Sequence, residues 1–153
     1  MTDFHIHICS LEAVREADLS IYDGIITIEN STEENPFRCS AIDPPQLVMC
    51  FDDISVPIDN FIMPQERHIL RALSFADEIN GGSLLIHCQA GISRSSAVAL
   101  AIISKNLGHG KETEAVALLE KINPYAMPNK SLVIITDNIL KRDNKLYREI
   151  EKK

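Results

Sequence analysis

One nine-residue segment combines the residue types that nucleophilic chemistry on an anion requires. Residues 87–95 read HCQAGISRS, directly after the apolar run 84–86 and directly before the apolar run 96–107. Five residues separate Cys88 from Arg94, so the backbone N–H groups of a tight loop can surround one tetrahedral dianion while the guanidinium binds two of its oxygens. The segment therefore predicts a phosphate-binding loop with a thiol at its base.

The setting of Cys88 favours a reactive thiolate. A cysteine thiol has a pKa of about 8.5, and a helix N-terminus with a neighbouring arginine lowers this to roughly 3.5–7.5. A strand that ends at His87 would deliver the sulfur to the loop, and the helix that follows would direct its positive N-terminal end toward it. We expect Cys88 to be ionised at rest. Arg94 and the loop amides would also stabilise a transferring phosphoryl group.

Residues 87–95 resemble the H-C-x-x-G-x-x-R-S signature of the cysteine-dependent protein tyrosine phosphatases, and the inner AGISRS is closest to the dual-specificity branch. The resemblance extends from the first expected strand to about Leu140. It implies a phosphotyrosine protein phosphatase-like fold and hydrolysis of phosphotyrosine, with phosphoserine and phosphothreonine left open, through a phosphocysteine intermediate. The residues expected to bind the substrate phosphate are Gln89, Ala90, Gly91, Ile92, Ser93 and Arg94.

Three residues of the segment have further expected roles. Gly91 would let the backbone turn and approach the ligand without a Cβ clash. Ser95 would donate its hydroxyl to the sulfur when the sulfur departs, and His87 would fix the loop through a hydrogen bond.

Ester cleavage also needs an acid that protonates the leaving oxygen, because an alkoxide or phenolate departs poorly. The resemblance implies an aspartate on the loop after the preceding strand, where Asp52 and Asp53 lie. We predict Asp53 as this acid, whereas Asp52 could cap the loop and Asp59 is a further alternative. Adjacent carboxylates raise one another's pKa, which would keep one of them protonated. Both could instead be solvated turn residues.

The expected reaction requires neither a metal nor another cofactor. His5 and His7 share one face of an expected strand, at a spacing that a metal could use. A pair of histidines alone does not make a complete metal site, so we predict no metal here.

Other interpretations stay open at this point. The chain could bind phosphate with little turnover, as a pseudophosphatase, or Cys88 could be a buried structural cysteine. It could act on a phosphoinositide, although the absence of lysine between Cys88 and Arg94 favours a phosphorylated protein or peptide. It could also be a thiol redox enzyme in which Cys50 or Cys9 resolves Cys88.

Composition limits the class of protein. A chain of 153 residues with 45% hydrophobic content predicts one domain over residues 1–153. The four cysteines form no C-x-x-C pair, and no apolar stretch is long enough to cross a bilayer, so we expect a soluble protein of the reducing cytoplasm. A net charge of −7 disfavours nucleic acid and anionic membranes as partners. A monomer is the default expectation.

The elements that must position the loop alternate between strands and helices. This order predicts an α/β fold with a mainly parallel central sheet flanked by helices, and with the loop at the carboxyl end of a central strand. Strands are expected at 4–8, 25–28, 47–51 and 84–86. Helices are expected at 10–17, from Pro64 to Gly81, at 95–107, from Gly110 to Ile122, from Asn129 to Leu140, and after Asp143 as a surface helix or frayed end. Ser10 would cap the first of these helices, and the second has an apolar stripe of Ile69, Leu70, Leu73, Ala76 and Ile79. A short helical turn is expected near 39–42.

Overall fold

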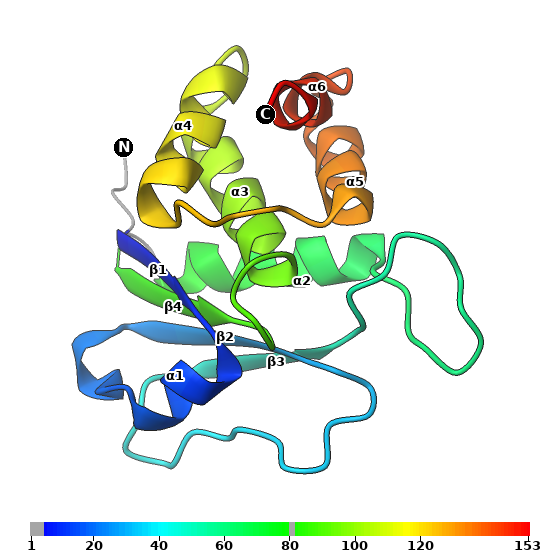
Figure 1. Ribbon diagram of the computed structural model, residues 1–153. Helices are drawn as coiled ribbons and strands as arrows, with labels where there is room; N and C mark the ends of the chain where they lie inside the picture. Colours follow the sequence, from blue (N-terminus) through cyan, green and yellow to red (C-terminus); the bar gives the residue numbers. More distant parts are fainter. Residues whose placement is uncertain (1–4, 80–81) are drawn as a thin grey trace.

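A four-stranded parallel sheet forms the centre of the computed structural model, which describes residues 5–79 and 82–153 (Figure 1). Every pair of neighbouring strands runs parallel, so the predicted α/β fold with a mainly parallel sheet is confirmed. The strands, in the spatial order β1-β4-β2-β3, are β1 (His5–Cys9), β2 (Gly24–Glu29), β3 (Gln46–Cys50) and β4 (Ser83–His87).

The two central strands are the most apolar because both of their faces are covered. β2 and β4 are buried along most of their length, whereas the edge strands β1 and β3 are only partly buried. His87 at the end of β4 pairs with Cys9 of β1 on one side and with Thr27 of β2 on the other. The loop after β4 therefore leaves the sheet at its carboxyl edge, between two neighbouring strands.

Helices cover the two faces of the sheet unequally (Figure 1). The larger core lies between the sheet and a layer of helices, in which α3 is buried on nearly all sides, as its apolar sequence predicts. A smaller core around Val14, Ile25 and Leu85 lies on the opposite face. The larger layer contains α2 (Glu66–Ile79), α3 (Arg94–Leu107), α4 (Glu112–Ile122), α5 (Lys130–Leu140) and α6 (Lys145–Glu151); α1 (Leu11–Glu16) and the 3₁₀ turn η1 (Leu19–Ile21) lie on the other face. In the described ranges, no helix has the length and apolarity to span a bilayer.

Several predicted helix ends are confirmed. The Ser10 hydroxyl accepts a hydrogen bond from the N–H of Ala13, which caps α1. The Asn129 side chain accepts from the N–H of Leu132 and so caps α5. Gly108 ends α3 with a φ of 91°.

The start and the buried face of α2 differ from the prediction. The helix begins at Glu66 rather than at Pro64, and the N–H of Gln65 donates to His68 Nδ1 just before it. His68 lies in the buried stripe, where its ring packs on Phe51 with centroids 4.3 Å apart. Burial lowers the pKa of His68 to about 4, so the ring is neutral. The predicted stripe residue Leu70 is consequently on the exposed side.

A turn is present near residues 39–42, as predicted, but it does not extend into a helix. The chain makes a single turn there, closed by a hydrogen bond from the N–H of Asp43 to the carbonyl of Ser40. The Asp43 carboxylate accepts from the N–H of Ser40, and Pro44 follows directly, which prevents a helix from continuing. Two predicted element ends, Phe4 and Gly81, lie outside the described residues.

A buried ion pair joins the ends of three helices away from the carboxyl edge. Arg142 Nη1 lies 2.7 Å from Glu112 Oε2, and the two side chains are only 3% and 7% exposed. The same guanidinium donates to the carbonyls of Ser104 and Gly108 at the end of α3. Burial raises the pKa of Glu112, but hydrogen bonds from Arg142 and from the N–H of Gly110 outweigh this and hold the pKa below its usual range.

Replacing Glu112 with Gln should destabilise the fold by about 3–5 kcal/mol at pH 7, because the buried guanidinium of Arg142 would lose its counter-charge. Urea denaturation measures the effect. Because the pKa of Glu112 is lowered on folding, its charge stabilises the fold fully above its ordinary value of 4.5 and loses this effect as the pH falls through the folded pKa. The difference between wild type and Glu112→Gln should therefore shrink below about pH 4.5.

Glu114→Gln provides the matched control, since Glu114 forms only an exposed ion pair with Lys111 in the same first turn of α4. This variant should remain close to wild type. If the two variants unfold at the same urea concentration, the buried pair does not hold the helices together.

Candidate active site

The loop between β4 and α3 is held from outside through its carbonyl groups. We call this loop the phosphate loop. Four of its carbonyl oxygens accept hydrogen bonds from α1 and from the segment 123–129. This segment connects α4 to α5, and we call it the strap. The four bonds are Leu11 N–H to Gln89 O (3.0 Å), Asn123 Nδ2 to Gly91 O (2.8 Å), Met127 N–H to Ile92 O (3.0 Å) and Asn129 N–H to Ser93 O (3.2 Å).

Outward carbonyls force the neighbouring N–H groups inward. In a trans peptide the N–H points opposite to the preceding C=O, so the amides of residues 90, 92, 93 and 94 face the inside of the loop. None of these four N–H groups donates to an acceptor in the part of the chain that the structure describes. They form a concave set of donors of the kind that binds anions.

Gly91 allows the tight path of this loop. Its φ is +74°, a conformation that side chains rarely adopt, and an added Cβ would lie 2.7 Å from the carbonyl carbon of Cys9. Any larger residue would push the loop away from the end of β1.

Cys88 lies at the base of the loop, 3% exposed, with its Sγ 3.1 Å from Ser95 Oγ. Ser95 is in the first turn of α3, so the sulfur lies beside the positive end of this buried helix. The N-cap residue Ser93 makes no side-chain cap, which leaves the first amides of α3 without a side-chain acceptor.

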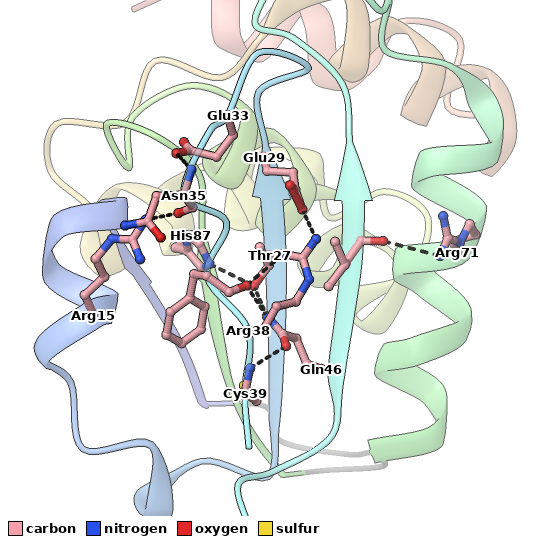
Figure 2. A network of polar contacts seen from close by, with 12 residues as sticks. Arg15, Thr27, Glu29, Glu33, Asn35, Arg38, Cys39, Gln46, Arg71 and His87 are labelled. Atoms are coloured by element: carbon pink, nitrogen blue, oxygen red, sulfur yellow. Dashed lines mark hydrogen bonds and ion pairs between the residues drawn. The ribbon is translucent and has the colours of Figure 1, made fainter. Parts of the chain in front are cut away.

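A chain of polar side chains fixes His87 at the end of β4, directly before Cys88 (Figure 2). Gln46 Nε2 donates to Thr27 Oγ1 at 2.8 Å, and Thr27 Oγ1 lies 2.8 Å from His87 Nε2. Burial lowers the pKa of His87 to about 4, so its ring stays neutral. The other ring nitrogen lies 3.4 Å from the Cys88 carbonyl. His87 is therefore anchored rather than charged.

The Arg94 guanidinium is buried beneath the loop and only partly paired. Nη1 donates to the carbonyl of Phe51 at 2.8 Å, whereas Nε is buried and has no partner among the described residues. A buried unpaired donor on a cation is costly, which favours an anion as its acceptor.

The adjacent aspartates after β3 lie in different surroundings. Asp53 faces the phosphate loop, where its Oδ1 accepts from Ser93 Oγ at 2.7 Å and from Asn129 Nδ2 at 2.9 Å. Asp52 is 5% exposed and accepts hydrogen bonds from the N–H and hydroxyl of Ser31 and from the N–H of Ile62. Asp52 thus closes the base of the loop 52–62.

The expectation that the adjacent carboxylates raise one another's pKa is wrong for Asp52. Burial raises its pKa, but the hydrogen bonds from Ile62 and Ser31 and the charge of Arg94 outweigh this, so the pKa lies below its usual range. Asp59 is exposed at the turn of the same loop, and within the described ranges no hydrogen bond joins it to residues 88–95.

The remaining candidate residues lie apart from this arrangement. All four cysteines are free, and Cys50 is exposed on β3. Burial, followed by the charge of Cys88, raises the pKa of Cys9 to about 11. Of the two histidines whose spacing a metal could use, His7 lies 2.8 Å from the Tyr22 hydroxyl. Within residues 5–79 and 82–153, no three His, Cys, Asp or Glu side chains are grouped as metal ligands.

Sequence reasoning missed the strap as part of the site. It identified Asn129 only as a helix cap and did not single out Asn123, although both contact the phosphate loop. The available signal was the side-chain amide of Asn129: an N-cap needs only an acceptor, so the two donors of an asparagine are free for other groups.

Comparison of sequences supports the resemblance. No family model matches the chain. Human dual specificity protein phosphatase 8 is 27% identical over 128 residues, which cover 82% of this chain and 19% of that protein. Rat dual specificity protein phosphatase 15 is 35% identical over 69 residues, 44% of this chain and 29% of that protein. The chain thus spans less than a third of the length of these curated relatives.

Comparison of structures supports the fold. The crystal structure of DUSP15 matches with a TM-score of 0.66 and 22% identity, over 97% of this chain and 91% of that chain. Human DUSP28 matches with a TM-score of 0.63 and 16% identity, over 89% and 91%. PTPMT1 in complex with PI(5)P matches with a TM-score of 0.60 and 19% identity, over 97% and 93%. In sequence and in fold, the chain is similar to the dual-specificity branch of the cysteine-dependent phosphatases, as its signature loop predicts.

Proposed function

We propose that the chain hydrolyses phosphate monoesters of phosphorylated proteins, with phosphotyrosine as the principal substrate and with phosphoserine and phosphothreonine as further candidates. The observation that supports this most strongly is that one short loop combines Cys88, a set of inward N–H groups and, at its end, Arg94 with an unpaired buried Nε. This arrangement offers a tetrahedral dianion a nucleophile and its counter-charges at one place.

The proposed first step transfers the phosphoryl group to sulfur. The Cys88 thiolate attacks phosphorus in line, a sulfur–phosphorus bond forms, and the bond from phosphorus to the ester oxygen breaks. Asp53 gives its proton to the leaving oxygen. Loop amides and Arg94 would hold the three equatorial oxygens, on which the charge of the transition state is spread.

The proposed second step releases phosphate. Asp53, now a carboxylate, takes a proton from a water molecule that attacks the phosphocysteine, and the sulfur–phosphorus bond breaks. The Ser95 hydroxyl, 3.1 Å from Sγ, would donate a hydrogen bond to the departing thiolate. Neither step needs a metal or an organic cofactor.

A phosphorylated protein or peptide suits the surroundings of the loop better than a polyphosphorylated lipid. No lysine lies between Cys88 and Arg94 to meet additional phosphates. The exposed side chains of Ile92, Tyr125 and Met127 form an apolar rim beside the loop. A cleft of about 600 Å³, lined by Asp53 and Ser93 and by apolar side chains that include Met127, could receive residues that flank the phosphorylated one.

A cytoplasmic location is also part of this proposal, because four free thiols suit a reducing compartment. We also propose that the protein acts as a monomer and binds neither nucleic acid nor membranes, in keeping with its net charge of −7.

Cys88→Ser should abolish phosphate release from a phosphotyrosine peptide, with a loss on the order of 10⁴-fold or more, because the hydroxyl is a far weaker nucleophile. Phosphate release is measured from a panel of phosphotyrosine, phosphoserine and phosphothreonine peptides and phosphoinositides, in the presence of a metal chelator. Cys50→Ser, which removes an exposed thiol, is the matched control and should keep wild-type activity.

Three results would contradict the proposal in different ways. Turnover by Cys88→Ser would rule out a phosphocysteine. Phosphopeptide binding without turnover by wild type would identify a pseudophosphatase. Phosphate release from phosphoinositides alone would show that the substrate is a phosphorylated lipid and not a phosphorylated protein.

Substitutions of the adjacent aspartates should separate catalysis from stability. Asp53→Asn should lower kcat/KM for an ester with a poor leaving group by roughly 10²–10⁴-fold, because no proton reaches the leaving oxygen. Asp52→Asn should instead lower the free energy of unfolding by roughly 1.5–3 kcal/mol, because the amide cannot accept all three hydrogen bonds made by the carboxylate. Steady-state kinetics and urea denaturation of both variants measure this. If Asp53→Asn keeps full activity, another residue is the general acid.

A further inference from the structure

We propose that Asn129 is a positioning residue for the acid Asp53, beyond its role as a helix cap. This inference rests on the function proposed above. The strap brings Asn129 next to both loops of the site, although 40 residues separate Asp53 from Ser93 and 76 separate Asp53 from Asn129.

Every polar group of Asn129 is engaged, and each contacts a different part of the site. Its backbone N–H donates to Ser93 O, and its Oδ1 accepts from Leu132 N–H, which caps α5. Nδ2 donates to Asp53 Oδ1 at 2.9 Å and to the carbonyl of Ile54 at 3.1 Å. Asn129 is 5% exposed, whereas Asp53 is exposed, so a buried amide holds a carboxylate that solvent can reach. Asn129 thus joins three segments: the phosphate loop, the loop 52–62 that carries Asp53, and the start of α5.

Capping alone does not account for an asparagine here. Ser, Asp and Asn serve about equally well as N-caps, since the cap needs only an acceptor. Only asparagine among them adds two amide donors. An aspartate would instead place a second carboxylate beside Asp53 and repel it.

The geometry also determines which oxygen of Asp53 can act. Asn129 and Ser93 both donate to Oδ1, which must therefore be an unprotonated acceptor. Among the described residues, Oδ2 has no hydrogen-bond partner. The proton that the acid donates thus belongs on Oδ2, and the amide of Asn129 fixes the direction in which this oxygen points. A carboxylic acid transfers its proton efficiently only when it is oriented toward the leaving oxygen.

Asn129→Ser tests this, because serine keeps the cap of α5 and loses both amide donors. Loss of acid catalysis matters most when the leaving oxygen is basic. We expect kcat/KM for phenyl phosphate to fall roughly 10- to 100-fold, part of the 10²–10⁴-fold that a general acid supplies. For 4-nitrophenyl phosphate, whose leaving group needs little protonation, the fall should be less than about threefold by the same reasoning. The ratio kcat/KM includes only the steps through phosphoryl transfer to Cys88.

A double substitution shows whether Asn129 acts through Asp53. In an Asp53→Asn background, Asn129→Ser should not change the ratio of kcat/KM between the two substrates any further, because the acid is already lost. A further change in that ratio would mean that Asn129 acts through another group.

Asn123→Ala is the matched control from the same strap. Asn123 donates to Gly91 O and Ser96 Oγ and makes no hydrogen bond to Asp53. It should lower kcat/KM by the same factor for both substrates. If Asn129→Ser also lowers both equally, Asn129 only shapes the loop, and the inference is overturned.

Thermal unfolding shows whether Asn129→Ser is folded. If it is not, Asn129→Thr, which also keeps an acceptor at the cap and lacks the amide donors, replaces it and should show the same selective loss with phenyl phosphate. Absence of hydrolysis by wild type overturns the proposed function and this inference together. Hydrolysis that depends on Cys88 but shows equal losses overturns the inference alone.

Discussion

The site depends on how the peptide groups of the phosphate loop are oriented. Hydrogen bonds from α1 and from the strap hold the loop carbonyls outward, and the planar trans peptide then turns the amides of residues 90, 92, 93 and 94 inward. Isolated inward amides in a short loop would be costly, because each is a donor without an acceptor. The outer hydrogen bonds offset this cost and keep the loop preorganised for an oxyanion, so that little reorganisation is needed when a substrate binds.

The rest of the fold supplies these outer contacts. Parallel pairing places His87 between β1 and β2, and its neutral ring is held by Thr27, to which Gln46 donates in turn (Figure 2). Buried α3 places its N-terminal end beside the sulfur, and the strap follows from the packing of α4 and α5 around α3. The loop 52–62 is closed at its base by the buried carboxylate of Asp52. The geometry of the site therefore depends on the packing of the strands and helices around it.

Much of this follows from the sequence where the information is local. The strand, loop and helix around Cys88, the turn of the backbone at Gly91 and the caps at Ser10 and Asn129 need only neighbouring residues. Other features depend on tertiary contacts. Asp52 and Asp53 are adjacent and chemically alike, and only the positions of Ser31, Ile62 and the strap separate their roles. The predicted stripe includes Leu70 and omits His68, whereas in the structure His68 is buried against Phe51 and Leu70 is exposed.

A crystal structure of the chain with vanadate tests the central claim most directly, because vanadate adopts the geometry of a transferring phosphoryl group. The account predicts vanadium bonded to Cys88 Sγ, with its equatorial oxygens accepting hydrogen bonds from the inward amides and from Arg94. The loop carbonyls should keep their outward contacts. An occupied loop in which the amides point away from the oxyanion, or vanadate bound without contact to Cys88, would contradict the account.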